Sequence, residues 1–398
     1  MSGIRSVFVL NTGSSSVKFR VVNPESGAVS AEGLVERIGE RIGEAGSDTP
    51  DHRVAIDRVL AGLDRGSIDA VGHRIVHGGD RFVEATLIDD EVERGIEQLA
   101  PLAPLHNPPG LLGIRAARAA LPELPQVAVF DTAFHATMPA AARSYAIDAE
   151  LAARHGIRRY GFHGTSYRIV SERAARFLNR PLGELRMIVL HLGNGASAAA
   201  ISGGRSVDTS MGMTPLEGLV MGTRSGDIDP AVLLYLQRNA GTTVDELDEL
   251  LNRRSGLLGL SGSRDMREVV GAADRGDAIA RLAFDVYTHR LRHYIGAYLA
   301  VLGGADALIF TAGVGENSAA VRAAALEGLS GLGLELDAAA NAQPNAQPGA
   351  QPNARPGAGA RRISPAGARI PVLVVPTDEE LQIARETAAV LTARDLRP

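Results

Sequence analysis

Residues Phe8-Val-Leu-Asn-Thr-Gly-Ser-Ser-Ser-Val-Lys-Phe19 place a glycine- and serine-rich turn between two apolar runs, 7–10 and 17–22. Apolar runs on both sides of such a turn predict two strands. The turn itself offers backbone N–H groups and hydroxyls, which together bind anions such as phosphate. This stretch therefore predicts a strand–loop–strand unit with a phosphate-binding loop.

Lys18 lies at the end of that turn and is the only lysine among the chain's 41 basic side chains. An ammonium is a compact point charge, and the planar guanidinium of arginine does not replace it at every site. Chance survival of one lysine is the simpler explanation. Its position in the loop favours a phosphate contact instead.

A second turn of the same kind, Leu192-Gly-Asn-Gly-Ala-Ser197, follows an expected strand at 186–191 and precedes one at 198–201. The order of strand, polar residue, glycine turn and strand is that of the first turn. This weak internal repeat hints at two related domains, each with its own phosphate loop.

Apolar runs and helical patterns alternate along the rest of the chain, as in α/β proteins. Further strands are expected at residues 70–77, 126–130, 307–310 and 371–376. Helices are expected at residues 91–100, 111–120 and 277–302. The proline-rich stretch 103–110 is expected to be irregular.

We expect an N-terminal domain over residues 1–147 and a second domain over 148–376. A C-terminal helix within 377–398 is expected to pack back on the first domain. Within the second domain, residues 341–356 repeat the tetrads NAQP, NAQP, GAQP and NARP. This composition predicts a disordered loop over 338–360.

The composition excludes several classes of protein. With no cysteine, the chain has neither disulfides nor thiolate ligands or nucleophiles. The net charge of −5 gives no sign of nucleic-acid binding. No apolar run approaches the roughly 20 residues that span a bilayer. Walker A, G-x-G-x-x-G and G-x-S-x-G motifs are absent. We therefore expect a cytoplasmic enzyme without a membrane or nucleic-acid partner.

Polar residues recur in turns at the ends of the expected strands. Each alone is explained as a turn or helix cap. Together with glycine-rich loops, the arginines and carboxylates match the needs of phosphoryl transfer, which uses N–H cradles, cations and Mg²⁺. The residues are Asn11, Arg74, His106, Asp131, His163, His191, Asn194, Arg224, Asp265 and Glu379.

Eight motifs resemble signatures of the acetate kinase family and occur in the family's order. They are Asn11-Thr-Gly-Ser-Ser-Ser-Val-Lys18, His73-Arg-Ile-Val-His-Gly-Gly79, Pro104-Leu-His-Asn-Pro-Pro109, Phe130-Asp-Thr-Ala-Phe-His135, Tyr160-Gly-Phe-His-Gly-Thr-Ser166, His191-Leu-Gly-Asn-Gly195, Met221-Gly-Thr-Arg-Ser-Gly-Asp-Ile-Asp-Pro230 and Gly313-Val-Gly-Glu-Asn317.

The resemblance implies the superfold of acetate and sugar kinases, Hsp70 and actin: two duplicated α/β domains with the active site in the interdomain cleft. It implies ATP and acetate as substrates, ADP and acetyl phosphate as products, Mg²⁺ (or Mn²⁺) as cofactor, and a homodimer. Tyr167 departs from the histidine that many members have at this position, and the tetrad tract enlarges a loop that is normally short.

The same resemblance implies roles for individual positions. The catalytic residues would be Asp131, His163 and Arg224, and the metal would be held by Asn11 and Glu379. Arg74 would bind the substrate carboxylate, and the apolar pocket for its methyl group would consist of Val76, Leu105, Phe162 and Pro215. The ATP-binding positions would be Ser14, Ser16, Lys18, His191, Leu192, Gly193, Asn194, Gly195, Asp265, Met266, Arg267, Gly313, Val314, Gly315, Glu316 and Asn317.

Other functions stay open at this point. A propionate kinase would share nearly every motif. A chaperone or filament protein of the same superfold would need an extra binding domain or assembly surface, and no segment here is long enough. A pseudokinase would lack a catalytic residue, and none is missing.

Overall fold

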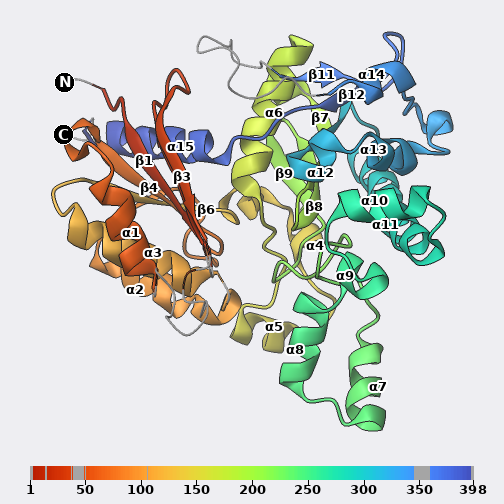
Figure 1. Ribbon diagram of the computed structural model, residues 1–398, viewed down its shortest axis with the longest axis horizontal. Coiled ribbons are helices and arrows are strands. Elements are labelled where there is room, and N and C mark those ends of the chain that lie inside the picture. Colours follow the sequence, from red (N-terminus) through yellow and green to blue (C-terminus); the bar gives the residue numbers. More distant parts are fainter. Residues whose placement is uncertain are drawn as a thin grey trace. The chain divides into compact units, whose positions relative to one another are not determined.

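The computed structural model describes residues 3–13, 16–36, 38, 49, 51–104, 106–344 and 359–395. The chain forms two compact units (Figure 1). Unit 1 comprises residues 1–136, 162–169 and 378–398, and unit 2 comprises residues 137–161 and 170–377.

Each unit is built on a six-stranded sheet. The strands of unit 1 are β1 (Val7–Thr12), β2 (Val17–Val22), β3 (Val29–Val35), β4 (Ala70–Ile75), β5 (Thr86–Leu87) and β6 (Gln126–Phe130). Those of unit 2 are β7 (Arg186–Leu192), β8 (Ala196–Ser202), β9 (Arg205–Thr209), β10 (Ala307–Thr311), β11 (Arg361–Arg362) and β12 (Val372–Val374).

The two sheets have the same topology. Their strand orders are β3-β2-β1-β4-β6-β5 and, read in the same sense, β9-β8-β7-β10-β12-β11. In both, the first three strands are antiparallel neighbours, the next pairings are parallel, and a short antiparallel strand lies at the edge. The predicted α/β fold of two duplicated domains is therefore confirmed.

Helices connect the strands and cover the sheets. They are α1 (His52–Ala61), α2 (Asp90–Gln98), α3 (Asn107–Ala120), α4 (Ala140–Arg143), α5 (Ala149–His155), α6 (Gly164–Leu178), α7 (Ala231–Ala240), α8 (Val244–Arg253), α9 (Gly256–Ser261), α10 (Met266–Asp274), α11 (Ala278–Leu302), α12 (Ala312–Asn317), α13 (Ala319–Leu326), α14 (Ala338–Ala342) and α15 (Glu379–Asp395).

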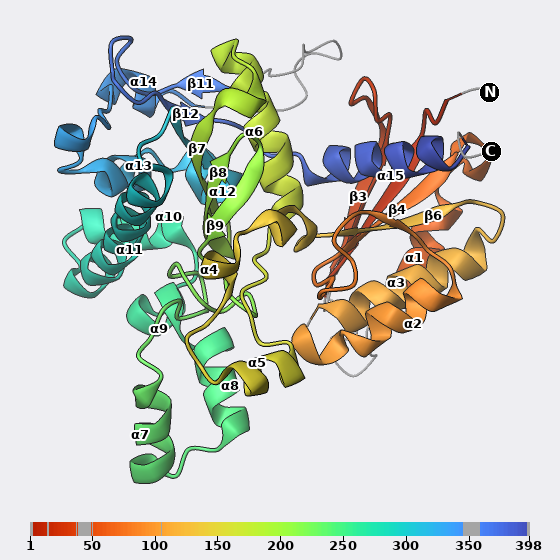
Figure 2. The same cartoon turned by 180° about the vertical axis from the view of Figure 1, so that it is seen from behind.

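In unit 1 the sheet lies between helices on both faces, with α15 on one side and α1 and α3 on the other (Figure 2). Phe8 and Leu10 of β1 point into an apolar core that α1 and α3 close. On the opposite face, α15 approaches β4 so closely that a Cβ on Gly72 would lie 2.6 Å from Thr387 Oγ1. Alternating strand residues thus fill two separate layers.

In unit 2 the long helix α11 packs against β7 and β8, and it also contacts α9, α10 and α13. The two central strands, β7 and β10, are apolar along most of their length, with Ile188, Val189 and Ile309 fully buried. Such continuous apolar strands are typical of a sheet covered on both faces.

The division into units differs from the expected boundaries at 147/148 and 376/377. Residues 137–147 belong to unit 2, because the Thr137 hydroxyl donates to the Ser206 carbonyl and the Tyr145 hydroxyl to the Glu217 carboxylate. Residues 162–169 belong to unit 1, where the Gly164 N–H donates to the Asp131 carbonyl. Helix α15 lies in unit 1.

Two local expectations were wrong. The stretch 103–110 is not wholly irregular, because α3 begins at Asn107 and accepts prolines in its first turn, where their missing N–H groups need no partner. The expected disorder over 338–360 fails at α14, which Asp337 caps by accepting from the Ala340 N–H. Residues 345–358 lie outside the described part of the chain.

Within the described ranges, no helix has both the length and the apolar character needed to cross a membrane.

The close approach of α15 to β4 predicts the effect of Gly72→Ala. A Cβ there would lie 2.6 Å from Thr387 Oγ1 and 2.8 Å from Ile383 Cγ2, so the helix must shift. We expect a loss of about 1–3 kcal/mol in the free energy of unfolding, measured with urea. Gly296→Ala in α11 is the control, because its Cβ meets nothing within 4 Å. It should stabilise the protein by about 0.5–1 kcal/mol, and equal losses in both variants would contradict the packing argument.

Candidate functional site

Three parallel strands of unit 1 carry polar residues at their carboxyl ends. Asn11 is the next-to-last residue of β1, Arg74 is the next-to-last residue of β4, and Asp131 directly follows β6. Because β4 pairs in parallel with both β1 and β6, these three ends meet at one edge of the sheet. That edge is where open α/β sheets bind their ligands.

Arg74 and Asp131 form the central ion pair of this edge. Arg74 Nη2 lies 2.7 Å from Asp131 Oδ2, and Arg74 Nε lies 3.1 Å from Asp131 Oδ1. Arg74 Nη1 also donates to Asn11 Oδ1 at 3.3 Å. Asp131 is 1% exposed. Burial lowers the pKa of Arg74, but the nearby carboxylates of Asp131 and Glu379 outweigh it and raise the pKa above its usual range. Arg74 is therefore a permanent cation at this site.

A strained turn brings His163 to the same place. His163 has φ +60°, in the left-handed region that favours glycine. The next residue, Gly164, donates its N–H to the Asp131 carbonyl at 3.0 Å, and a Cβ there would lie 2.2 Å from that oxygen. Thr165 Oγ1 lies 3.4 Å from Asp131 Oδ1. These contacts of Gly164 and Thr165 hold the start of α6 against Asp131. Because His163 directly precedes them in the chain, it lies next to the same site.

Two glutamates at the start of α15 contact different cations of unit 1. Glu379 Oε2 lies 3.8 Å from Arg74 Nε. Glu380 Oε1 lies 2.5 Å from Lys18 Nζ, and Glu380 Oε2 lies 3.9 Å from Arg20 Nη1. Burial raises the pKa of Glu380, but hydrogen bonding and charge from Lys18 outweigh it and lower the pKa. Lys18 thus has an internal counter-ion, which sequence reasoning did not anticipate.

The first glycine turn is described only in part. Gly13 N donates to Ser16 O at 2.7 Å, which closes the turn between β1 and β2. His52 Nε2, at the start of α1, lies 2.8 Å from the Gly13 carbonyl, and this contact supports the turn. Ser14 lies outside the described residues.

Unit 2 has a cavity of about 820 Å³. It brings together eight of the positions that were predicted to bind ATP: Gly193, Asn194, Asp265, Met266, Arg267, Gly313, Val314 and Asn317. Its wall also includes residues that sequence reasoning missed: Gly222, Leu257, Arg264, Val270, Gly271, Tyr287, Ser318, Ala319 and Ala320. Gly222 lies within the quoted motif Met221–Pro230 and Ser318 directly follows the motif Gly313–Asn317, which is the signal that could have indicated them.

Backbone contacts between glycine turns shape this cavity. Gly193 N donates to Gly195 O at 3.0 Å, and Gly222 N donates to Asn194 O at 3.1 Å. A Cβ on Gly222 would lie 2.4 Å from Asn194 Oδ1, so a larger residue there would displace the Asn194 side chain. The glycine thus leaves Asn194 its observed position on the cavity wall.

Asp265 and Arg267 stand together at the cavity rim. Arg267 Nη2 lies 2.5 Å from Asp265 Oδ2, and hydrogen bonds from Arg267 lower the pKa of Asp265 to about 2. Asp265 also caps α10 by accepting from the Arg267 N–H at 2.9 Å. The pair is therefore ionised at neutral pH and fixed on a helix end.

Five other predicted ATP-binding positions do not line the cavity: His191, Leu192, Gly195, Gly315 and Glu316. Leu192 is fully buried in β7. The Glu316 carboxylate instead accepts from the N–H groups of Ala312 at 2.9 Å and Thr377 at 3.2 Å. Burial raises the pKa of Glu316. Its observed contacts are with the backbone.

Arg224 is a cation without a carboxylate partner in the described part of the chain. Its Nη1 lies 3.2 Å from the Pro215 carbonyl and 3.7 Å from Met221 Sδ, and in the described part of the chain it has no ion pair with a carboxylate. Burial lowers the pKa of Arg224 without a compensating charge. A partly buried guanidinium of this kind is suited to binding an anion.

The four predicted pocket residues are distributed over both units. Val76 and Phe162 lie in unit 1, and the Phe162 ring packs edge-on against His77 with centroids 5.5 Å apart. Pro215 lies in unit 2 beside Arg224. Leu105 lies outside the described residues.

Oxygen donors suited to Mg²⁺ are present in unit 1. Asn11, Asp131 and Glu379 surround Arg74 and offer amide and carboxylate oxygens, the ligands that Mg²⁺ prefers. Within the described ranges, no group of three or more His, Cys, Asp or Glu side chains is arranged to hold a metal ion. This set fits an ion that keeps several water ligands, as Mg²⁺ commonly does.

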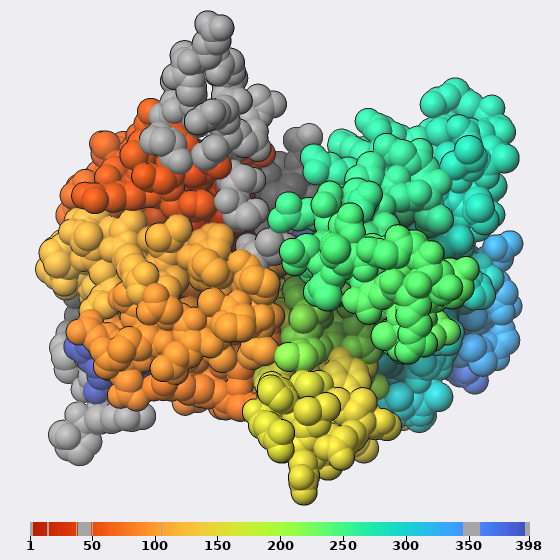
Figure 3. Space-filling view, turned by 90° about the horizontal axis from the view of Figure 1, so that it is seen from below, coloured from red at the N-terminus to blue at the C-terminus, as the bar shows by residue number. Residues whose placement is uncertain are grey.

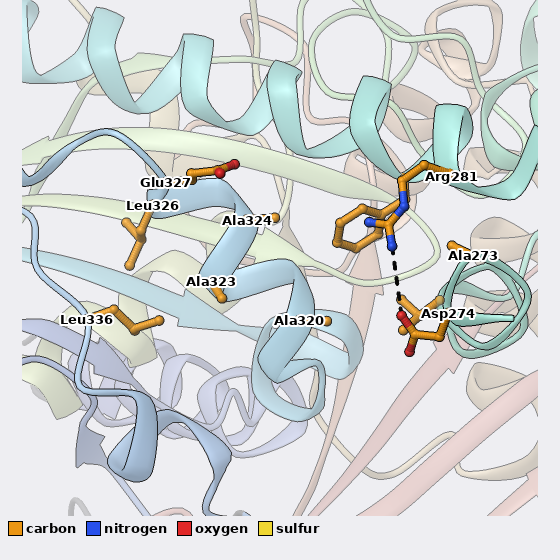
Figure 4. Close-up of a pocket in the computed structure, with 11 residues that line it drawn as sticks. Ala273, Asp274, Arg281, Ala320, Ala323, Ala324, Leu326, Glu327 and Leu336 are labelled. Atoms are coloured by element: carbon orange, nitrogen blue, oxygen red, sulfur yellow. Dashed lines mark ion pairs between the residues drawn. The ribbon is translucent and has the colours of Figure 1, made fainter. Parts of the chain in front are cut away.

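A second cavity, of about 500 Å³, lies between α10, α11 and α13 (Figure 4). Alanines of α13, including Ala320 and Ala323, face it together with Phe284 and Leu336. The ion pair Arg281–Asp274, at 3.9 Å, lies at its edge. This cavity shares Val270 of α10 and Ala320 of α13 with the first, so the two cavities adjoin at these helices.

A sequence profile of the acetokinase family matches residues 6–385. The chain belongs to the acetokinase family. It is 58% identical to the acetate kinase of Leifsonia xyli, over 98% of this chain and 99% of that protein. It is 57% identical to the acetate kinase of Streptomyces coelicolor, over 98% of each.

Solved structures of this family share the fold. The crystal structure of Porphyromonas gingivalis acetate kinase is 42% identical, with a TM-score of 0.88 over 97% of this chain and 99% of that one. The crystal structure of a propionate kinase from Francisella tularensis is 41% identical, with the same TM-score and coverage. The acetokinase fold predicted from the motifs is confirmed.

The pair Lys18–Glu380 predicts a pH-dependent stability of this acetokinase. Glu380 has a pKa below its ordinary value of 4.5, so the pair stabilises fully above that pH and loses its effect as pH falls through the folded pKa. Lys18→Met should cost about 1 kcal/mol at pH 7, a figure that allows for the 45% exposure of Lys18. The cost should shrink at lower pH, as measured by urea unfolding at pH 7 and pH 4.

Arg53→Met is the matched control for this prediction. Arg53 is 83% exposed and lies 4.0 Å from Asp57, so its removal should change stability little at either pH. A cost for Lys18→Met that stays constant with pH would rule out the ion pair as the cause.

Proposed function

We propose that this protein is an acetate kinase, which transfers a phosphoryl group reversibly between ATP and acetate and so interconverts them with ADP and acetyl phosphate. The observation that carries the proposal is Arg224, a partly buried guanidinium without a carboxylate partner among the described residues. Membership of the acetokinase family and the high identity to acetate kinases support it.

The acceptor needs no general base in this reaction. A carboxylic acid with a pKa of about 4.3 is already ionised at neutral pH. Catalysis then consists of holding two anions in line and neutralising the charge on the transferring group. The side chains of the protein therefore contribute positive charge and hold the substrates in position.

The two arginines have different parts in this scheme. Arg224 offers an unmatched charge to the transferring phosphoryl group. Arg74 binds the acetate carboxylate with the part of its guanidinium that Asp131 and Asn11 leave available. His163 donates a hydrogen bond to the phosphoryl oxygens as negative charge develops there.

Asp131 acts as a positioning group. Its carboxylate accepts from Arg74 and from Thr165, and its backbone carbonyl accepts from Gly164. These contacts fix both the guanidinium of Arg74 and the turn that carries His163. Asp131 thereby orients the cations and has no proton to remove from the substrate.

The nucleotide occupies the cavity of unit 2, with its phosphates on the turn His191–Gly195 and its adenosine between the loops at 265–267 and 313–317. Ser14, Ser16 and Lys18 contribute the first phosphate loop. Mg²⁺, with Mn²⁺ as the alternative, would be held by oxygens of Asn11 and Glu379 and would supply positive charge to the phosphates. The cavity is lined by all three residues of the loop 265–267. From the loop 313–317 it is lined by Gly313, Val314 and Asn317.

A propionate kinase is the second candidate, because the chain resembles the propionate kinase from Francisella tularensis as closely as the acetate kinase structure. The family resemblance assigns the contacts with a short acyl chain to the apolar residues Val76, Leu105, Phe162 and Pro215. One added methylene changes binding in such a pocket by only about 1–3 kcal/mol.

We further propose that the protein is a cytoplasmic homodimer. Helix α7 presents apolar side chains that no part of the described structure buries, with Val232, Leu234 and Tyr235 all exposed. Helix α7 belongs to the green part of the surface that Figure 3 shows. A second copy of the chain would cover this helix, and sedimentation equilibrium measures the association.

The activity is tested by trapping the acyl phosphate. Incubation with ATP, Mg²⁺ and acetate should yield acetyl hydroxamate when hydroxylamine is present. Among acetate, propionate and butyrate, kcat/KM should be highest for acetate and should fall with each added methylene by roughly 10-fold. No hydroxamate above a no-enzyme control would refute the kinase, and a higher value for propionate would favour the second candidate.

The roles of the arginines predict unequal effects of substitution. Arg224→Ala and Arg74→Ala should each lower kcat by roughly 10²–10³-fold or more, since each removes a charge that stabilises the transition state. Arg53→Ala, at an exposed position of α1, should leave kcat unchanged. Circular dichroism should show that all three variants are folded. Equal rates in the three variants would contradict the assignment.

A further inference from the structure

Arg322 is a buried arginine that the proposed reaction does not use. It lies on α13 and is 1% exposed, which makes it one of the largest fully buried side chains of the protein. Burial, together with the charge of Arg361, lowers the pKa of Arg322 to about 10. Burial of a cation costs free energy unless hydrogen-bond partners compensate it, so the partners of Arg322 indicate its role.

The guanidinium of Arg322 binds four oxygens, none of them a carboxylate. Nη1 donates to the carbonyls of Gly315 and Glu316, each at 2.9 Å. Nε donates to Asn341 Oδ1 at 2.7 Å, and Nη2 donates to the Asn341 carbonyl at 2.8 Å. Arg322 thus satisfies carbonyls at the ends of two short helices, α12 and α14, that have no partner within their own helix.

Asn341 completes this cluster from the other side. Its Nδ2 donates to the Ala319 carbonyl at 2.9 Å, while its Oδ1 and carbonyl both accept from Arg322. Asn341 is also the first residue of the tetrad tract, where the composition predicted disorder. The tract therefore begins with a residue that anchors the neighbouring fold.

The carbonyls that this cluster holds lie in the segment that carries one wall of the larger cavity. Residues 313, 314 and 317–320 line that cavity. Arg322 contacts Gly315 and Glu316, which lie between the lining residues in the sequence, and Asn341 contacts the lining residue Ala319. Figure 4 shows Ala320, Ala323 and Ala324 of α13 facing the smaller cavity. The helix position of Arg322 directs its side chain elsewhere, toward α12 and α14.

We propose that Arg322 and Asn341 form a clamp that positions the segment 313–319 for nucleotide binding. The inference rests on the proposed use of this cavity for the nucleotide. Neither residue touches the ligand, so both are positioning residues. Without the clamp, the segment 313–319 can adopt other conformations. Nucleotide binding must then order this segment, and that cost weakens the affinity for the nucleotide. Acetate binding, which involves Arg74, does not depend on the clamp.

The test uses the full-length chain with Arg322→Lys, Arg322→Met and Asn341→Ala. Lysine keeps the charge but lacks the planar fork that reaches four oxygens. We expect the Kd for ADP, measured by isothermal titration calorimetry, to rise about tenfold or more in each variant, in line with the loss of a charged hydrogen bond. KM for ATP should rise in parallel, while KM for acetate stays within about twofold.

Two control variants have matched chemistry elsewhere in unit 2. Arg292 Nη2 donates to the Ala324 carbonyl of the same helix α13 at 3.0 Å, away from the larger cavity. Asn252 Nδ2 donates to the Asp248 carbonyl of α8 at 3.2 Å. Arg292→Met and Asn252→Ala should leave the Kd for ADP unchanged.

The outcomes separate this inference from the proposed function. If the wild type binds ADP and the clamp variants bind it equally well, even with a lowered Tm, the clamp is only structural and the inference is overturned. If the wild type itself binds no ADP, the proposed function fails and the inference with it. Should Arg322→Met fail to fold, Asn341→Ala decides, because Arg322 keeps its bond to the Asn341 carbonyl in that variant.

Discussion

The ion pair between Arg74 and Asp131 is the interaction on which the edge of unit 1 depends. Asp131 makes three separate contacts with two elements: its N–H donates to Ile75 of β4, its carboxylate binds Arg74 of the same strand, and its carbonyl accepts from Gly164 at the start of α6. At 1% exposure, the carboxylate would be costly without this cation. One residue thus fixes a strand end, a helix start and a guanidinium.

The two arginines of the site differ in what surrounds them. Arg74 has carboxylates on two sides, which hold its charge and its orientation. Arg224 has carbonyl and thioether contacts only, so its charge is uncompensated by any described carboxylate. The first arrangement suits a group that must be positioned, and the second suits one that must attract an anion. A single kind of side chain therefore provides both functions through its partners.

Much of this could be read from the sequence, because local patterns determine where strands and turns form. The run around Thr12 and the apolar strand Gln126–Phe130 were placed within a residue or two. Contacts distant in sequence were not accessible in this way. Lys18 was assigned to a phosphate loop, and its partner Glu380 lies 362 positions later in the chain. Glu316 belongs to a glycine motif, yet its carboxylate binds backbone N–H groups.

The sequence by itself determined where strands, helices and turns alternate, since these follow from periodicity and turn chemistry. Its ordered motifs carried the resemblance that implied the acetokinase family and the duplicated α/β fold. Only the tertiary structure decided which motif residues line a cavity and which cations are paired with a carboxylate. It also showed that Asn341, the first residue of the tetrad tract, is held in the fold by hydrogen bonds. The physical reason is that burial and pairing are properties of residues brought together by folding. A buried guanidinium such as Arg322 is recognised only when its four oxygen partners are seen.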